Sequence, residues 1–121
     1  MEQKYIIGDI VTYNNKVMVI KEPRDGIHFD LFSHEEILVY CFVDVNEIKP
    51  IKLTNAILEK NGWKKSNYYG NDYTKGEFHF DGANFLHIGD YDYPLVDGPI
   101  EYVHELQHVF FGLNLYSGMS V

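Results

Sequence analysis

Cysteine and long apolar runs are scarce in this sequence. Cys41 is the only cysteine among the 121 residues, which excludes an internal disulfide and is typical of a reducing cytoplasm. We expect its thiol to be buried, because it lies in the apolar run 37–43 with no nucleophile partners nearby in the sequence. No apolar run is long enough to span a bilayer, and residues 1–4 do not open a signal peptide. These features predict a cytoplasmic protein with no membrane partner.

Basic residues are absent from the last third of the chain. Residues 76–121 hold seven acidic residues and neither lysine nor arginine, so all ten basic residues lie in 1–75, together with eleven acidic ones. A negatively charged surface repels phosphate backbones, which argues against direct binding of nucleic acid. The acidic segment could attract a basic protein partner or a cation, or it could serve only to keep the protein soluble.

The chain does contain enough apolar material for a packed core. Hydrophobic residues make up 45% of the sequence and aromatic residues 16%, a composition that argues against intrinsic disorder. The length fits one domain or two small subdomains. We predict an α+β fold, with a β-rich SH3-like subdomain at 1–52 and an α+β subdomain at 53–121, packed as one unit.

Short β-strands are indicated throughout the first subdomain. The apolar runs lie at 6–13, 16–20, 27–32, 37–43 and 45–51. Asn14 and Asn15 separate the first two runs, and asparagine tolerates the left-handed conformation that a tight hairpin turn requires. Four or five short strands in about fifty residues favour a small SH3-like barrel or a bent sheet.

The second subdomain alternates helix, strands and helix. Thr54 is a suitable N-cap for a helix over 55–60, and Trp63 would pack back on that helix. Three antiparallel strands are predicted next, at 68–73, 77–80 and 85–88. An aromatic and acidic loop at 89–99 then leads to an amphipathic C-terminal helix over 100–113.

The string His104-Glu105-Leu106-Gln107-His108 matches the H-E-x-x-H pattern of zinc metalloproteases. In that pattern two histidines one helical turn apart hold zinc, and the glutamate between them activates a water molecule. His104 and His108 are thus candidate metal ligands, and Glu105 is the candidate catalytic residue of a small zinc-dependent hydrolase.

Two features of the sequence argue against such a zinc site. A helical projection from Ile100 places both histidines on the polar arc with Glu101 and Glu105, whereas a catalytic zinc needs a walled cleft. Zinc proteases of this pattern also take a third ligand downstream, yet residues 109–121 contain no His, Asp, Glu or Cys. We therefore interpret the string as an exposed helix face that binds no cofactor, and keep the zinc hydrolase as an alternative.

Two other groups of residues are candidates for function. His79 and His87 should be cross-strand neighbours, as a metal-binding or pH-sensing pair or, more simply, as part of a solvated polar face. The loop at 89–99 has aromatic and acidic residues suited to protein contact, although they could equally cover the edge of the core. Its candidate contact residues are Asp90, Tyr91, Asp92, Tyr93 and Asp97.

Two segments of the sequence are distinctive, IKLTNAILEKNGW at 51–63 and YVHELQHVFFGL at 102–113. Both resemble segments of a group of small uncharacterised proteins of gut Bacteroidetes and their phages and mobile elements. In that group the second segment is similar to YVHQLQN, which lacks the glutamate and the second histidine of the zinc pattern. The resemblance brings no established activity or catalytic residue.

Protein contact is the function that the sequence favours. We expect a non-enzymatic accessory protein of a phage or mobile element, acting in the host cytoplasm on an unidentified protein partner. The specific form is an acidic inhibitor of a basic host protein. The alternatives are the zinc hydrolase and a structural protein associated with the virion. The oligomeric state is left open.

Overall fold

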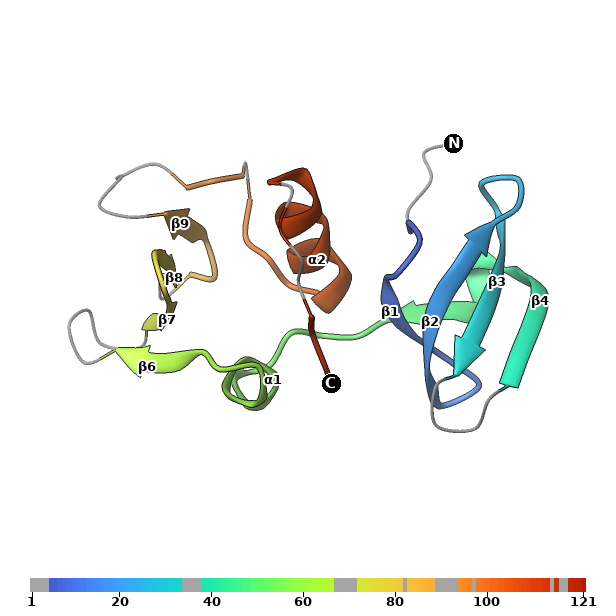
Figure 1. Cartoon of the computed structure of the whole chain (residues 1–121), viewed down its shortest axis with the longest axis horizontal. Coiled ribbons are helices and arrows are strands. Elements are labelled where there is room, and N and C mark those ends of the chain that lie inside the picture. Colours follow the sequence, from blue (N-terminus) through green and yellow to red (C-terminus); the bar gives the residue numbers. More distant parts are fainter. Residues whose placement is uncertain are drawn as a thin grey trace. The chain divides into compact units, whose positions relative to one another are not determined.

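The computed structural model describes residues 5–33, 38–66, 72–81, 83–88, 94–96, 98–113, 115 and 118–121. The chain divides into two units, Met1–Ile51 and Lys52–Val121 (Figure 1). Each unit has its own antiparallel β-sheet and its own hydrophobic core, so the two are described in turn.

The first unit is a five-stranded antiparallel sheet in the order β4-β3-β2-β1-β5. Its elements are β1 (Ile10–Tyr13), β2 (Lys16–Pro23), β3 (His28–Ser33), β4 (Leu38–Asp44), the 3-10 helix η1 (Val45–Glu47) and β5 (Ile48–Pro50). Asn14 and Asn15 form the β1–β2 turn with φ angles of 53° and 62°. Because these angles lie in the left-handed region, the predicted hairpin turn is confirmed.

One face of this sheet carries the core of the first unit. The buried core residues are Tyr5, Val11, Met18, Ile20, Phe29, Leu31, Val43 and Ile48. Since side chains alternate along a strand, Val19, Phe32 and Val39, which are partners in the register, lie on the opposite face. The first unit therefore has an apolar row on the face away from its core.

The second unit is a four-stranded antiparallel sheet in the order β6-β7-β8-β9, together with two helices. Its elements are α1 (Asn55–Lys60), β6 (Lys64–Ser66), β7 (Asp72–Lys75), β8 (Phe78–Phe80), β9 (Leu86–Ile88) and α2 (Val103–Gly112). The buried core residues are Leu58, Trp63, Tyr73, Phe80, Leu86, Ile100, Leu106 and Phe110. The core thus joins both helices to the sheet.

The start of α1 follows the prediction. The Oγ1 atom of Thr54 accepts the backbone N–H of Ile57 at 3.2 Å, which satisfies one of the free donors at a helix start. Trp63 is buried in the same cluster as Leu58, and its backbone N–H donates to the Leu58 carbonyl at 3.0 Å. The cap and the packing of Trp63 on α1 are confirmed.

The predicted fold class, α+β, is wrong. The described residues are mostly β, with two antiparallel sheets, and α2 is the only helix among them longer than six residues. α1 has the predicted bounds, and it ends before Asn61 and Gly62, whose φ of 88° does not continue a helix. α2 begins at Val103 rather than at residue 100, since Tyr102 is extended and bridges to Lys52. The second sheet also gains a fourth strand, because Lys64–Ser66 pairs with β7.

Two further structural facts bear on the sequence predictions. Cys41 is exposed, so the expected burial of its thiol is wrong. Neither α-helix in the described residues has the length and apolar character needed to cross a membrane.

Candidate functional site

Glu105 of the His-Glu-Leu-Gln-His string caps the N-terminus of α2. Its Oε1 atom accepts the backbone N–H groups of Tyr102 at 2.9 Å and of Glu101 at 3.1 Å. The first turn of a helix leaves backbone N–H groups without intrahelical acceptors, and a glutamate at this position can reach back to them. The glutamate of the string therefore has a structural role as a cap.

The two histidines of the string differ in burial. His104 is only 5% exposed, whereas His108 is half-buried. Their ring centroids are 5.4 Å apart, and the Tyr102 ring stacks on His104 at 5.9 Å. The predicted exposed face is therefore wrong for His104. The helical projection treated Tyr102 as part of the helix. In the structure the backbone of Tyr102 is extended, and the Tyr102 ring stacks on His104 in the first turn of α2.

The geometry around these histidines differs from that of a catalytic zinc site. Within the described residues, no three His, Cys, Asp or Glu side chains are grouped so that they could hold a metal ion. A catalytic zinc needs three protein ligands and a glutamate free to activate water. Glu105 instead holds two backbone N–H groups with one carboxylate oxygen. The zinc hydrolase predicted as an alternative thus gains no support here.

An apolar groove runs along α2 beside these residues. It has a volume of about 490 Å³ and is open to solvent. The residues that define this α2 groove are Leu95, Val96, Glu105, His108, Val109 and Leu113. Because most of the lining is apolar and only Glu105 and His108 are polar, the groove is suited to an apolar side chain of a partner rather than to a polar metabolite.

The predicted contact loop lies largely outside the described residues. Asp90, Tyr91, Asp92, Tyr93 and Asp97 are all in the part of the chain that the structure does not describe. Two neighbours of these residues in the sequence, Leu95 and Val96, do line the α2 groove. The protein-contact role of the five residues stays a prediction.

His79 and His87 are directly paired across β8 and β9, as predicted. Their rings stack with centroids 4.9 Å apart, and the Nε2 atom of His87 lies 3.0 Å from Oδ2 of Asp81. His87 is buried, so the predicted solvated face is wrong for this residue. Burial alone would raise the pKa of Asp81, but hydrogen bonds with His87 and with the backbone N–H groups of Phe85 and Ala83 hold that pKa below its ordinary value. Asp81 thus ties the β8–β9 loop to His87.

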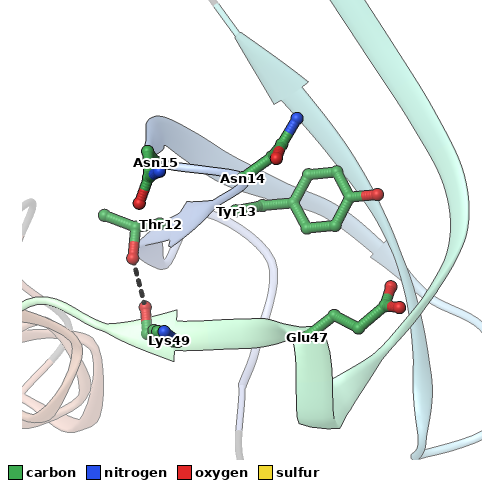
Figure 2. A pocket seen from close by; sticks show the side chains of 6 residues that line it. All are labelled: Thr12, Tyr13, Asn14, Asn15, Glu47 and Lys49. Carbon is green, nitrogen blue, oxygen red and sulfur yellow. Dashed lines mark hydrogen bonds between the residues drawn. The ribbon is translucent and has the colours of Figure 1, made fainter.

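A small polar pocket lies beside the β1–β2 turn of the first unit. Figure 2 shows its lining: Thr12, Tyr13, Asn14, Asn15, Glu47 and Lys49. Its volume is about 450 Å³, and the Oγ1 atom of Thr12 donates to the Lys49 carbonyl at 3.2 Å. This hydrogen bond links β1 to β5, so the Thr12 hydroxyl stabilises the sheet and is not free to bind a ligand in the pocket.

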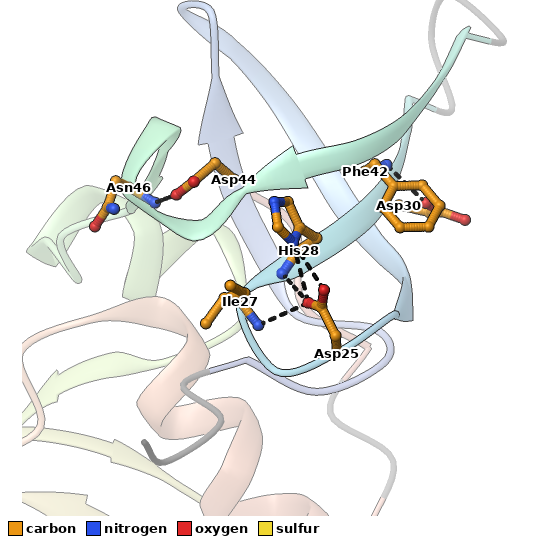
Figure 3. Close-up of polar contacts among 7 residues, drawn as sticks. All are labelled: Asp25, Ile27, His28, Asp30, Phe42, Asp44 and Asn46. Atoms are coloured by element: carbon orange, nitrogen blue, oxygen red, sulfur yellow. Dashed lines mark hydrogen bonds and ion pairs between the residues drawn. The ribbon is translucent and has the colours of Figure 1, made fainter.

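Sequence reasoning missed a buried carboxylate in the first unit. The Oδ2 atom of Asp30 accepts hydrogen bonds from the Nε of Arg24, at 2.9 Å, and from its Nη2. The Oδ1 atom of Asp30 accepts the backbone N–H of Phe42 at 3.0 Å (Figure 3). The Arg24 guanidinium, followed by the Phe42 N–H, holds the pKa of Asp30 below its ordinary value. The sequence did contain a signal for this site, since Asp30 is a lone aspartate inside the apolar run 29–32. A carboxylate buried in such a run needs a charged or hydrogen-bonding partner.

Asp30 holds Phe42 at a β-bulge. The β3–β4 register shifts there, so that Cys41 and Phe42 together lie opposite Asp30. Phe42 has φ of 54°, which is strained for a bulky residue, and its side chain is 60% exposed. The Arg24 guanidinium carbon lies 5.4 Å from the centre of the Phe42 ring. Strained, exposed residues held by their surroundings are found preferentially at functional sites.

A turn beside the bulge places His28 next to Phe42. Asp25 Oδ1 accepts the backbone N–H groups of Ile27 at 3.1 Å and His28 at 2.8 Å, and its Oδ2 lies 2.9 Å from the His28 Nδ1 (Figure 3). The hydrogen bond with the His28 ring is the main cause of the lowered pKa of Asp25. The rings of His28 and Phe42 are 6.0 Å apart. Arg24 and His28 therefore both lie beside the exposed Phe42 ring.

Comparisons with known proteins give no match for this chain among family models, curated proteins or solved structures. The described residues hold two candidate contact surfaces, the α2 groove in the second unit and the bulged strand β4 in the first.

Proposed function

We propose that this protein is a non-enzymatic protein-binding module whose α2 groove holds a basic, amphipathic segment of a partner. The observation that carries the proposal is an open apolar groove within a stretch of sequence, 76–121, that has seven acidic residues and no basic ones. Apolar contact supplies affinity, while charge complementarity supplies partner choice and fast association.

The lining of the α2 groove favours one kind of bound segment. Leu95, Val109 and Leu113 offer apolar contact to a matching apolar face. Glu101 and Glu105, at the start of α2, favour lysine or arginine at one end of the bound segment. A helix with an apolar face and a basic end has both features, and such helices bind in apolar grooves of this kind.

An inhibitor of a basic host protein is the form of this function that we propose. The resemblance to small proteins of Bacteroidetes phages and mobile elements supports a bacterial host protein as the partner. A basic surface that normally binds nucleic acid would be blocked by carboxylates that occupy it. The acidic loop residues Asp90, Asp92 and Asp97 would add to this charge.

Capture from host lysate tests the proposal directly. The full chain is immobilised and incubated with lysate of a gut Bacteroidetes strain, and bound proteins are identified after washes at about 50 mM and about 500 mM salt. We expect a basic protein that is retained at low salt and released at high salt. The absence of any partner at low salt, or an acidic partner indifferent to salt, would contradict the proposal.

Two matched substitutions at the C-terminal end of α2, one at its last turn and one at its C-cap, locate the binding surface. Leu113→Ser removes an apolar wall of the α2 groove, while Phe111→Ser removes a more exposed apolar side chain that does not line it. With the captured partner purified, we expect Leu113→Ser to weaken binding about tenfold and Phe111→Ser to change it less than about twofold. Equal effects of the two would show that the groove is not the site.

The alternatives give different results in simple measurements. The zinc hydrolase predicts one zinc per chain and loss of activity in Glu105→Gln. The virion component predicts a single defined oligomer of the purified chain in size-exclusion chromatography. Charge reversal of Asp90, Asp92 and Asp97 to lysine affects only the inhibitor, whose capture of a basic protein should be lost.

A further inference from the structure

Three of the four sheet edges in the described residues are protected. β6 presents the exposed lysines Lys64 and Lys65, and charged side chains of this kind discourage the addition of another strand. β9 is covered by the following segment, because the backbone N–H of Leu95 donates to the Leu86 carbonyl at 2.6 Å. β5 has only three residues and ends at Pro50, which lacks the N–H that a neighbouring strand needs.

β4 is the fourth edge, and its regular part at 38–40 has none of these protections, because the bulge interrupts pairing only from Cys41 and Phe42 onward. The strand is seven residues long, and no strand of the described residues pairs on its outer side. Its side chains include the exposed apolar residues Leu38, Val39 and Phe42. A long edge strand with exposed apolar side chains is a template for pairing with another chain, and soluble proteins normally avoid it.

The bulge determines which part of β4 can accept a partner strand. Regular pairing with β3 runs from Leu38 to Tyr40 and is interrupted at Phe42, whose backbone N–H is held by Asp30. A strand added to β4 would therefore align with 38–41 and would meet the exposed Phe42 ring where that alignment ends. The strained backbone at Phe42 is thus the feature that holds an aromatic contact beside the accepting edge.

Charge determines which kind of strand fits. Asp44 pairs with His28 in the β3–β4 register, and Asp25 is bonded to that same histidine, so two carboxylates lie at the end of β4 near Phe42. The Arg24 guanidinium beside Phe42 is offset by its ion pairs with Asp30 and Glu22, so this end of β4 carries more negative than positive charge. They favour lysine or arginine at the adjacent end of an incoming strand. A second copy of this chain is a poor occupant, because each copy has a net charge of −8.

We infer that β4 is a docking edge for an extended segment of a partner protein, which has apolar residues at its centre and basic residues at its end and adds as a sixth strand. Main-chain hydrogen bonds would supply affinity, and contacts with Val39 and Phe42 would supply specificity. This docking edge lies in the first unit and is independent of the α2 groove.

A synthetic peptide tests the docking edge in the full chain. The probe is a capped peptide of about eight residues, Lys-Lys-Val-Thr-Val-Thr-Lys-Lys, with a fluorescent label for anisotropy measurements. We expect binding with a dissociation constant of about 100 µM or tighter. A peptide with glutamates in place of the lysines should bind about tenfold more weakly. A peptide N-methylated at both valines and both threonines has lost the central N–H donors on both of its edges and should not bind.

Two matched lysine substitutions distinguish a loss of strand pairing at β4 from a general effect of added positive charge. Val39→Lys protects β4 in the way that β6 is protected, whereas Val17→Lys makes the same change on β2, which has neighbours on both sides. Val39 and Val17 are 46% and 50% exposed, so the two substitutions add a charge at similarly exposed positions. We expect Val39→Lys to weaken peptide binding about tenfold and Val17→Lys to change it less than about twofold.

Several results would overturn the inference. The lysine peptide could fail to bind at about 1 mM, or the N-methylated peptide could bind as well as the parent. Val17→Lys and Val39→Lys could weaken binding equally, which would indicate a charge effect alone. A concentration-dependent dimer that Val39→Lys abolishes would show that the occupant is a second copy. Leu113→Ser should leave peptide binding unchanged, so failure here and failure of the α2 groove are distinguishable.

Discussion

The Glu105 carboxylate accepts the backbone N–H of Tyr102 at 2.9 Å, three residues earlier in the chain. Through this contact, the glutamate of the His-Glu-Leu-Gln-His string caps the start of α2. That string was the only one in the sequence that suggested a catalytic chemistry. In a zinc hydrolase the same glutamate would face a metal-bound water. The capping contact explains why glutamate stands at this position without any reference to zinc.

Substitutions at Glu105 should separate capping from catalysis. Glu105→Ala removes the acceptor of two backbone N–H groups and should lower the free energy of unfolding by about 1 kcal/mol. Glu105→Gln keeps an acceptor oxygen and should cost less than half of that. Urea unfolding followed by Trp63 fluorescence provides the measurement, with the exposed Glu101→Ala as the control. A glutamine variant as unstable as the alanine variant would contradict the capping role.

Zinc should have no effect on the stability of this protein. A ligand that binds the folded state at a hundred times its dissociation constant adds about 2.7 kcal/mol to the free energy of unfolding. We expect the melting temperature to be unchanged on adding zinc, and elemental analysis of purified protein to give less than about 0.1 zinc per chain. His104→Ala and His108→Ala should then show the same lack of response. One zinc per chain together with a raised melting temperature would restore the hydrolase.

Local chemistry made parts of the fold predictable from the sequence. The Asn14-Asn15 turn and the Thr54 cap were both found, because each depends on one or two residues and the backbone next to them. The cross-strand pairing of His79 with His87 was also found, because a short hairpin loop determines the register of the strands that it joins.

Contacts between distant residues were not predictable in the same way. Nothing near Phe42 in the sequence indicates a left-handed backbone, since the residue that holds it, Asp30, is twelve positions away. β6 was missed because Lys64 and Lys65 are exposed edge residues without an apolar pattern. The burial of His104 depends on Tyr102 being extended, whereas the helical projection assumed that it was helical.

The stability of the first unit should depend on the ionisation of Asp30. Its pKa is lowered in the folded protein by Arg24 and then by the Phe42 N–H, so the ionised carboxylate contributes stability at neutral pH. That contribution is present above the unfolded-state pKa of about 3.9 and is lost as the pH falls through the lower folded-state value. Asp30→Asn should therefore cost about 2–3 kcal/mol at pH 7, and the difference from wild type should shrink as the pH falls.

Urea unfolding of the full chain by circular dichroism, at pH values from about 7 to about 2, measures this difference. Asp44→Asn is a suitable control, because Asp44 accepts the Asn46 N–H in an exposed turn and should cost less than about 1 kcal/mol. A wild-type-to-variant difference for Asp30→Asn that stays constant over the whole range would contradict an ionised role for Asp30.

Glycine and alanine at position 42 should differ in stability but not in binding. Phe42 has φ of 54°, a conformation that costs a residue with a Cβ atom more than it costs glycine. Both substitutions remove the ring and its contact with Arg24, so Phe42→Gly should be more stable than Phe42→Ala by about 1 kcal/mol. Both substitutions should weaken binding of the lysine peptide equally, because both remove the exposed aromatic contact beside β4. A glycine variant that binds as well as wild type would show that the strained phenylalanine serves only the fold.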